Sequence, residues 1–296
     1  AFLYFLDENV DFAVIEAGMG GRLDATNVVA KPVCSVITSI SMDHMQYLGE
    51  TLEEISKHKA GIIKEGTPAV SSNTDPIVVG VLEQACKDMD TTLTLASWNE
   101  VNLLNLSIEG TVFSYKGNNY RIRLLGRHQL ANAILAIETA DILKNHGVKI
   151  SQDAIEAGLW QTSWRGRFEI IEEQPIFVID GAHNEDASRR LRDAMETYFS
   201  GKKLIFIMGI FADKEFKKVL EIMAPLPEIL ITITPPGNRA LPSKILADEA
   251  KNYCDGKIID AGSVAAAVDI AYENSSPEDV IAAFGSLSFL RELTCC

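Results

Sequence analysis

Short apolar runs of strand length alternate with stretches of helical periodicity through the first third of the chain. Residues 12–16 and 33–38 are rich in branched apolar side chains, and both are predicted to be strands. Helices are expected over 51–59 and 75–87, with a short strand at 69–71 between them. Strands that alternate with helices predict a parallel sheet covered on both faces.

The pattern changes between about residues 92 and 125. Two strand-like runs, 112–115 and 120–124, flank the sequence K-G-N-N, which has typical hairpin-turn chemistry. This segment is predicted to form a small antiparallel sheet. A long helix with an apolar face should follow, because Gly147 stands just beyond the periodic stretch.

A second alternation of strands and helices follows a linker-like stretch at 160–166. Its strands are expected at 176–179, 204–208, 229–233, 257–259 and 280–283, and its helices at 187–198, 215–223, 244–252 and 264–272. This pattern is typical of a complete doubly wound α/β domain. The chain is therefore predicted to have two domains, 1–165 and 166–296.

Composition narrows the class of protein. The 296 residues are 47% hydrophobic and carry a formal charge of −14, which fits a globular chain and argues against a nucleic-acid partner, since phosphate binding requires a basic face. No apolar run approaches the ~20 residues of a membrane span. The five cysteines lack metal-site spacing, so a cytoplasmic location is expected. Because the chain opens on Ala1, we expect it to be part of a longer protein.

Candidate chemistry follows the first two predicted strands. Glu16 ends the first and precedes a glycine-rich turn, which does not meet the dinucleotide pattern G-x-G-x-x-G because Leu23 occupies the last position. His44 follows the second strand, so it could meet Glu16 at one rim of the sheet. A carboxylate and an imidazole can hold a divalent ion that also ligates nucleotide phosphates, although a lone histidine here is more often structural.

Five motifs occur in a fixed order: E-A-G-M-G-G-R-L-D-A-T-N, S-I-S-M-D-H, K-A-G-I-I-K, H-Q-x-x-N-A and D-G-A-H-N. In these motifs the chain resembles the folylpolyglutamate synthase/dihydrofolate synthase family of the Mur ligase superfamily. The resemblance implies the latter part of a parallel-sheet ATPase domain with a small antiparallel sheet, followed by a Rossmann-like C-terminal domain. It implies an ATP-dependent ligase that adds L-glutamate to folate, and in some members to dihydropteroate, through an acyl phosphate.

The resemblance also implies the metal chemistry of the site. Glu16 and His44 match Mg²⁺ ligands, and Lys59 matches a lysine that is carboxylated on its amine and binds a second Mg²⁺. Two metal ions can neutralise phosphate charge and bridge the reacting oxygens. His183 matches a residue close to the glutamate, and with Lys59 it is the expected catalytic group.

Nucleotide and folate positions come from the same resemblance. Asn132, Arg167 and Asp180 match contacts to ATP, the last of them to the ribose. The resemblance places the folate substrate at the four residues after the glycine turn: Arg22, Leu23, Asp24 and Ala25. Without the resemblance, Asn132 would equally suit a polar cluster at the N-terminus of the helix. Arg167 would be interpreted as an interdomain salt-bridge residue.

The main departure of the chain from the family concerns a phosphate-binding loop. The resemblance implies a phosphate-binding G-x-x-G-K-[ST] loop, and residues 1–296 contain none, so we expect these residues alone to be inactive. A muramyl-peptide ligase of the same superfamily and a non-catalytic nucleotide-binding module are the alternatives, and a nicotinamide oxidoreductase is a more distant one. The family is usually monomeric.

Overall fold

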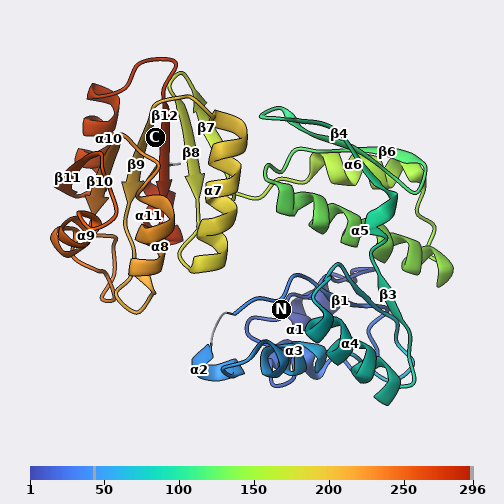
Figure 1. The fold of residues 1–296 in the computed structure, drawn as a ribbon. Helices are drawn as coiled ribbons and strands as arrows, with labels where there is room; N and C mark the ends of the chain where they lie inside the picture. The colour runs from blue at the N-terminus through green and yellow to red at the C-terminus, as the bar shows by residue number, and fades with distance from the viewer. Residues whose placement is uncertain (43–44, 294–296) are drawn as a thin grey trace. The chain divides into compact units, whose positions relative to one another are not determined.

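The computed structural model describes residues 1–42 and 45–293, except for the side chain of Gln46, and divides the chain into two compact units (Figure 1). The first unit contains residues 1–97 and 134–150, and the second contains 98–133 and 151–296. This division by compactness differs from the expected boundary at 165/166, which concerns the two domains of the family and stays a prediction.

The first unit contains a three-stranded parallel sheet in the order β1-β2-β3. Its elements are α1 (Phe2–Asp7), the 3-10 turn η1 (Ala25–Val28), β1 (Ser35–Ile37), α2 (Met45–Leu48), α3 (Leu52–Ala60), β2 (Ala69–Ser71), α4 (Pro76–Asp88) and β3 (Leu93–Leu95). Apolar side chains of α3, of the turn after it, of α4 and of the strands form its core, including Ile37, Ile63, Val78 and Leu82. The fold class predicted for this part is confirmed.

Local sequence explains where the two main helices begin. Thr51 accepts from Glu54 N, and the Glu54 carboxylate accepts from Thr51 N, so α3 opens with a complete capping box. Asp75 accepts from Ile77 N and Val78 N at the start of α4. Both helices were predicted within one residue of these starts.

The strand predicted at 12–16 is wrong: the segment is extended coil, and the Val14 side chain is 99% exposed. A strand forms only with a hydrogen-bonding neighbour, and β1 pairs with β2 alone among the described residues. The segment 93–95 was placed with the hairpins, yet it joins the parallel sheet as β3 beside β2.

The second unit begins with a three-stranded antiparallel sheet, as predicted. Its elements are the 3-10 turn η2 (Trp98–Glu100), β4 (Val101–Ser107), β5 (Gly110–Tyr115) and β6 (Asn118–Ile122), followed by α5 (Arg127–Asn145), which contributes to both units, and α6 (Gln152–Gln161). Phe113 and Tyr120 face each other across β5 and β6, with ring centroids 5.5 Å apart. The positive φ values of Lys116 and Gly117 form the tight turn between these strands.

The remaining residues form a six-stranded sheet in the order β11-β10-β9-β12-β8-β7. Its strands are β7 (Glu169–Glu173), β8 (Ile176–Asp180), β9 (Leu204–Met208), β10 (Ile229–Ile233), β11 (Lys257–Gly262) and β12 (Val280–Phe284). All pairs are parallel except β7–β8, and β7 was not predicted. The five predicted strands are confirmed, two of them with the same bounds.

Helices cover both faces of this sheet, as the doubly wound pattern predicts (Figure 1). One face packs against α7 (Glu185–Phe199), α8 (Phe216–Met223) and α9 (Ser243–Ala250), and the other against α10 (Val264–Glu273) and α11 (Leu287–Leu293). Strands buried on both faces explain the continuous apolar runs in their sequences. Within the described residues, no helix combines the length and apolarity needed to cross a bilayer.

Candidate functional site

In the first unit, the glycine-rich turn packs on the end of α3. Arg22 N donates to the His58 carbonyl at 2.8 Å. A Cβ added to Gly21 would lie 3.0 Å from the carbonyl oxygens of both His58 and Lys59, so only glycine allows this close approach. Two motifs that are separated by more than 30 residues in the sequence are therefore in direct contact.

Asp24 orders the segment that follows the turn. Its carboxylate accepts hydrogen bonds from Met19 N at 2.9 Å, Thr26 N at 2.8 Å and Thr26 Oγ1 at 2.6 Å. These donors lower the pKa of Asp24 to about 2, so its charge is fixed at neutral pH. The side chains of Arg22, Leu23 and Ala25 are exposed around it. Their role toward folate stays a prediction.

The predicted metal ligands are only partly placed. Glu16 is exposed in the coil before the turn, Lys59 is half-buried in the last turn of α3, and His44 lies outside the described residues. Among the residues that the structure describes, no three His, Cys, Asp or Glu side chains gather into a metal cluster. The Glu16 carboxylate has the hard oxygen chemistry that Mg²⁺ prefers, whereas the Lys59 ammonium would have to be carboxylated first.

In the second unit, Asp180 ends β8 at the carboxyl edge of the sheet, as predicted. Its two carboxylate oxygens accept from Phe168 N and Ala182 N, each at 2.8 Å. Burial raises the pKa of Asp180, against the two N–H donors and the nearby Arg167 guanidinium, which lower it. Asp180 therefore holds the turn that carries Arg167, while its own charge is costly to bury.

His128 lies close to the same arginine. Burial and the positive charges of Arg190 and Arg167 lower the pKa of His128 to about 4, against the opposing effect of Asp186. The interactions of Arg167 with both Asp180 and His128 place the start of α5, the W-R-G-R-F turn and D-G-A-H-N in one region of the second unit. The sequence predicted Asn132, Arg167 and Asp180 individually.

The remaining residues of D-G-A-H-N connect the strand to the next helix. His183 Nδ1 lies 2.7 Å from the Gly181 carbonyl, which holds the ring over the turn. Asn184 caps α7 by accepting from Ala187 N at 2.9 Å. The catalytic role expected of His183 stays a prediction. Arg190, on α7, was not predicted, because nothing in its spacing distinguishes it from a surface arginine.

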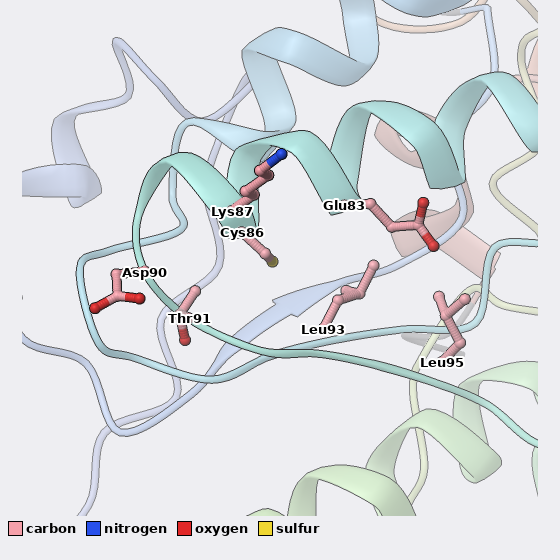
Figure 2. A pocket seen from close by; sticks show the side chains of 7 residues that line it. All are labelled: Glu83, Cys86, Lys87, Asp90, Thr91, Leu93 and Leu95. Atoms are coloured by element: carbon pink, nitrogen blue, oxygen red, sulfur yellow. The ribbon is translucent and has the colours of Figure 1, made fainter.

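Two hollows mark the surfaces of the units. One of about 450 Å³ lies between α4 and β3, where Figure 2 shows side chains from Glu83 to Leu95 around it, and it contains no predicted site residue. A larger hollow of about 840 Å³ in the second unit is lined by β7 and by the segment that includes Trp164 and Arg167. Of the candidate nucleotide residues, Arg167 lines the second hollow, and none lines the first.

Comparison with known proteins matches two separate segments of the chain to two domain families. Residues 1–140 match the Mur ligase middle domain, and residues 166–287 match the Mur ligase glutamate ligase domain. Over 296 aligned residues, which cover 97% of this chain and 67% of the relative, the chain is 35% identical to folylpolyglutamate synthase of Lacticaseibacillus casei. The chain belongs to the folylpolyglutamate synthase family.

Other members of the family agree with this assignment. Dihydrofolate synthase/folylpolyglutamate synthase of Bacillus subtilis is 37% identical over 233 residues, which are 75% of this chain and 53% of the relative. The crystal structure of Thermotoga maritima folylpolyglutamate synthase superposes with a TM-score of 0.82 at 31% identity, covering 99% of this chain and 68% of that one. The chain thus spans about one half to two thirds of the length of these relatives.

The Mycobacterium tuberculosis folylpolyglutamate synthase, solved in complex with ADP and AMPPCP, superposes with a TM-score of 0.87 at 30% identity. That likeness covers 100% of this chain and 71% of the other. The predicted family and fold class are confirmed by these members of the folylpolyglutamate synthase family.

Proposed function

We propose that this protein carries out, as part of a folylpolyglutamate synthase, the ATP-dependent ligation of L-glutamate to folate. The products are folyl-γ-glutamate, ADP and phosphate, and dihydropteroate is an alternative acceptor. The observation that carries the proposal is the convergence of Asp180, Arg167 and the start of α5 in one region of the second unit. Residue types there suit a nucleotide: a carboxylate for ribose hydroxyls, a guanidinium for phosphates and an amide for the base.

The reaction is mostly one of positioning and charge neutralisation. In the proposed sequence, the γ-phosphoryl group of ATP passes to a folate carboxylate, which becomes an acyl phosphate as ADP leaves. The glutamate amine, having lost a proton, then attacks the acyl carbon, and phosphate departs with the electrons of the C–O bond. Arg167 would balance phosphate charge, and His183 would orient the glutamate or accept its proton.

Magnesium is part of the proposal. Glu16 and His44 would hold one ion, and Lys59, once carboxylated, would hold a second. The direct contact between the glycine turn and the end of α3 supports this, because it fixes the backbone that carries Lys59 beside the segment after Glu16. Bound there, Mg²⁺ would neutralise the phosphate oxygens of ATP. The exposed side chains of Arg22, Leu23 and Ala25, on the loop ordered by Asp24, would contact the folate.

Residues 1–296 alone are proposed not to complete the reaction. They contain no G-x-x-G-K-[ST] loop, whose lysine would neutralise the β- and γ-phosphates. We further propose a monomeric, cytoplasmic enzyme.

The test is phosphate release from ATP, measured with folate and L-glutamate together and with each one omitted. We expect residues 1–296 to bind ADP without turnover, and a chain that also carries the phosphate loop to release phosphate only when both substrates are present. Release with a UDP-muramyl peptide instead of folate would indicate the muramyl-peptide alternative. ADP binding without glutamate-dependent release by the chain that carries the loop would indicate a non-catalytic module.

A further inference from the structure

The segment Arg22–Ala25 is attached to the end of α3 on both of its sides. At its start, Arg22 N donates to the His58 carbonyl at 2.8 Å. The backbones also touch at Gly61, where an added Cβ would lie 2.6 Å from Arg22 Cα. After the segment, Asn27 reaches the same helix end, because its Nδ2 donates to the Gly61 carbonyl at 3.0 Å. The segment is therefore docked on α3 at two places.

The acceptors of the Asn27 side chain fix the direction of its hydrogen bonds. Asn27 Nδ2 also donates to the Arg22 carbonyl at 3.2 Å, within the loop itself. Backbone carbonyl oxygens only accept, so the amide nitrogen has to face both of them. The backbone carbonyl of Asn27 accepts in turn from Lys64 Nζ at 3.4 Å, on the segment that follows α3. One half-buried residue thus joins the loop to the helix end.

The end of α3 needs the donors that the loop supplies. The last carbonyls of a helix have no partner within the helix. Here the carbonyl of His58 accepts from the loop backbone, and that of Gly61, the residue that ends the helix, accepts from Asn27. Lys59 lies between these two acceptors in the sequence. Its backbone cannot move relative to the loop without breaking one of the two bonds.

The loop is also ordered within itself. The Asp24 carboxylate accepts from Met19 N, from Thr26 N and from Thr26 Oγ1. Since these bonds hold the loop together as a unit, its place beside α3 depends on the contacts made by Arg22 and Asn27.

We propose that Asn27 is a positioning residue, which holds the segment Arg22–Ala25 beside Lys59 and so aligns the folate carboxylate with the phosphoryl group that it receives. The inference rests on the proposed function, in which this segment contacts folate and Lys59 acts on the phosphate side of the reaction. The transfer requires both reactants in one geometry, and a displacement of about 1 Å can cost roughly a hundredfold in rate. The proposed nucleotide contacts belong to the second unit, so nucleotide binding should not depend on Asn27.

Asn27→Asp tests the docking without measuring activity. The carboxylate has nearly the same shape but no donor, and its oxygens would face two carbonyl oxygens. Amide hydrogen exchange of residues 1–296 is the measurement, and the Arg22 amide should exchange at least about fivefold faster in the variant. Asn9→Asp is the matched control: Asn9 Nδ2 donates to the Asp7 carbonyl at 3.2 Å, which is not part of this loop, so Arg22 exchange should not change.

Kinetics of a chain that also carries the phosphate loop test the role in the reaction. Asn27→Asp should raise the KM for folate and lower kcat, each at least about tenfold, while the dissociation constant of ADP stays within about twofold. Partial unfolding would lower kcat with the folded fraction and leave KM unchanged, so the change in KM identifies positioning. Asn27→Ala, which removes the donor without adding a charge, should give smaller changes in the same direction.

The outcomes separate the inference from the function on which it rests. Unchanged Arg22 exchange in both Asn27 variants would overturn the docking, whatever the kinetics. Faster exchange with a folate KM within about twofold of the wild type, or a parallel rise in the dissociation constant of ADP, would overturn the positioning role and leave the proposed function standing. If the wild-type chain with the phosphate loop shows no turnover that requires folate and glutamate, the proposed function and the inference both fail.

Discussion

Two five-residue segments of this chain have nearly the same pattern and different structures. Residues 12–16 read F-A-V-I-E and residues 176–180 read I-F-V-I-D, and each is followed by a glycine-containing turn. The second is β8, a strand between β12 and β7, in which Val178 is fully buried. The first is extended coil, in which Val14 is almost fully exposed.

The difference shows what an apolar pattern does and does not determine. Both segments have the branched side chains that suit a sheet, but only β8 has strands on both sides that satisfy its backbone groups. The pattern therefore gives a segment the capacity to be a strand, and the available partners decide whether it becomes one. The carboxylates that end the two segments differ in their surroundings in the same way. Glu16 is exposed, whereas Asp180 accepts hydrogen bonds from two backbone N–H groups.

The largest expected effect comes from placing a charge in each segment. Val178→Asp would bury an unpaired carboxylate in the core and should cost at least ~4 kcal/mol in the free energy of unfolding or prevent folding. Val14→Asp should change it by less than ~0.5 kcal/mol, because the site is exposed. Urea denaturation followed by circular dichroism measures both. A comparable loss in Val14→Asp would show that residues 12–16 are packed in solution.

The pH dependence of stability should also separate the two regions. The pKa of His128 is about 4 in the folded chain against 6.5 for an ordinary histidine, so between these values the unfolded chain binds more protons. The free energy of unfolding should therefore fall as the pH drops from 6.5 to 4, by roughly 3 kcal/mol, because the two pKa values differ by about 2.5. Asp24, with a pKa of about 2 against 3.8, contributes stability that is lost only below 3.8.

Urea denaturation at several pH values between 7 and 4 tests this window. In His128→Gln the fall in stability should be smaller than in the wild type, whereas Asp24→Asn should leave the slope between pH 6.5 and 4 unchanged. Parallel curves for the wild type and His128→Gln would contradict the burial of a neutral imidazole.

Much of the fold could be predicted from sequence, and the exceptions are strands at the edges of the sheets. Strands buried on both faces, such as β9 and β10, have continuous apolar sequences and were predicted with their observed bounds. Strand β7 lies at the edge of its sheet and is only partly buried, so its sequence can be E-I-I-E-E. Its three glutamates interrupt the apolar run by which the central strands were predicted. Strand β3 was assigned to the wrong sheet, since a three-residue apolar segment does not specify its partner.

For the candidate site, sequence gave the individual residues through the order of their motifs, but not their contacts. Nothing in H-Q-x-x-N shows that the Gln129 amide joins His128 to Asn132, because that depends on how side chains within one helical turn are oriented. The approach of Gly21 to the end of α3 likewise depends on tertiary packing.

A smaller effect is expected from adding a methyl group after each segment. An alanine Cβ at position 181 would lie 2.7 Å from Leu287 Cδ2, so Gly181→Ala should cost about 1 kcal/mol after side-chain adjustment. At Gly18 the nearest atom would be Asp24 Oδ2 at 3.4 Å, an ordinary contact, and Gly18→Ala should be neutral or stabilise by up to about 0.5 kcal/mol. Thermal unfolding of the two variants would measure this, and an equal loss in both would contradict the difference in packing.

The smallest effect on stability, and the most informative one, is expected at the carboxylates themselves. Because the folded pKa of Asp180 lies above its unfolded value, its charge lowers stability at neutral pH relative to acid pH, where the group is protonated. Asp180→Asn removes that cost but turns one acceptor into a donor facing a backbone N–H, so the net change should stay within about 1 kcal/mol. Glu16→Gln, at an exposed site, should be within about 0.5 kcal/mol.

Binding should distinguish these variants where stability does not. Asp180→Asn is expected to weaken ADP affinity at least tenfold, or about 1.4 kcal/mol, while Glu16→Gln leaves metal-free ADP binding unchanged; isothermal titration calorimetry without added Mg²⁺ measures both. If Asp180→Asn loses several kcal/mol of stability while its ADP affinity is unaltered, the carboxylate only stabilises the turn at Phe168, and its proposed contact to the nucleotide is contradicted. If Asp180→Asn instead loses ADP affinity without losing stability, the buried Asp180 carboxylate serves ligand binding and not folding. Groups with perturbed pKa values are common at binding and catalytic sites, which agrees with that role.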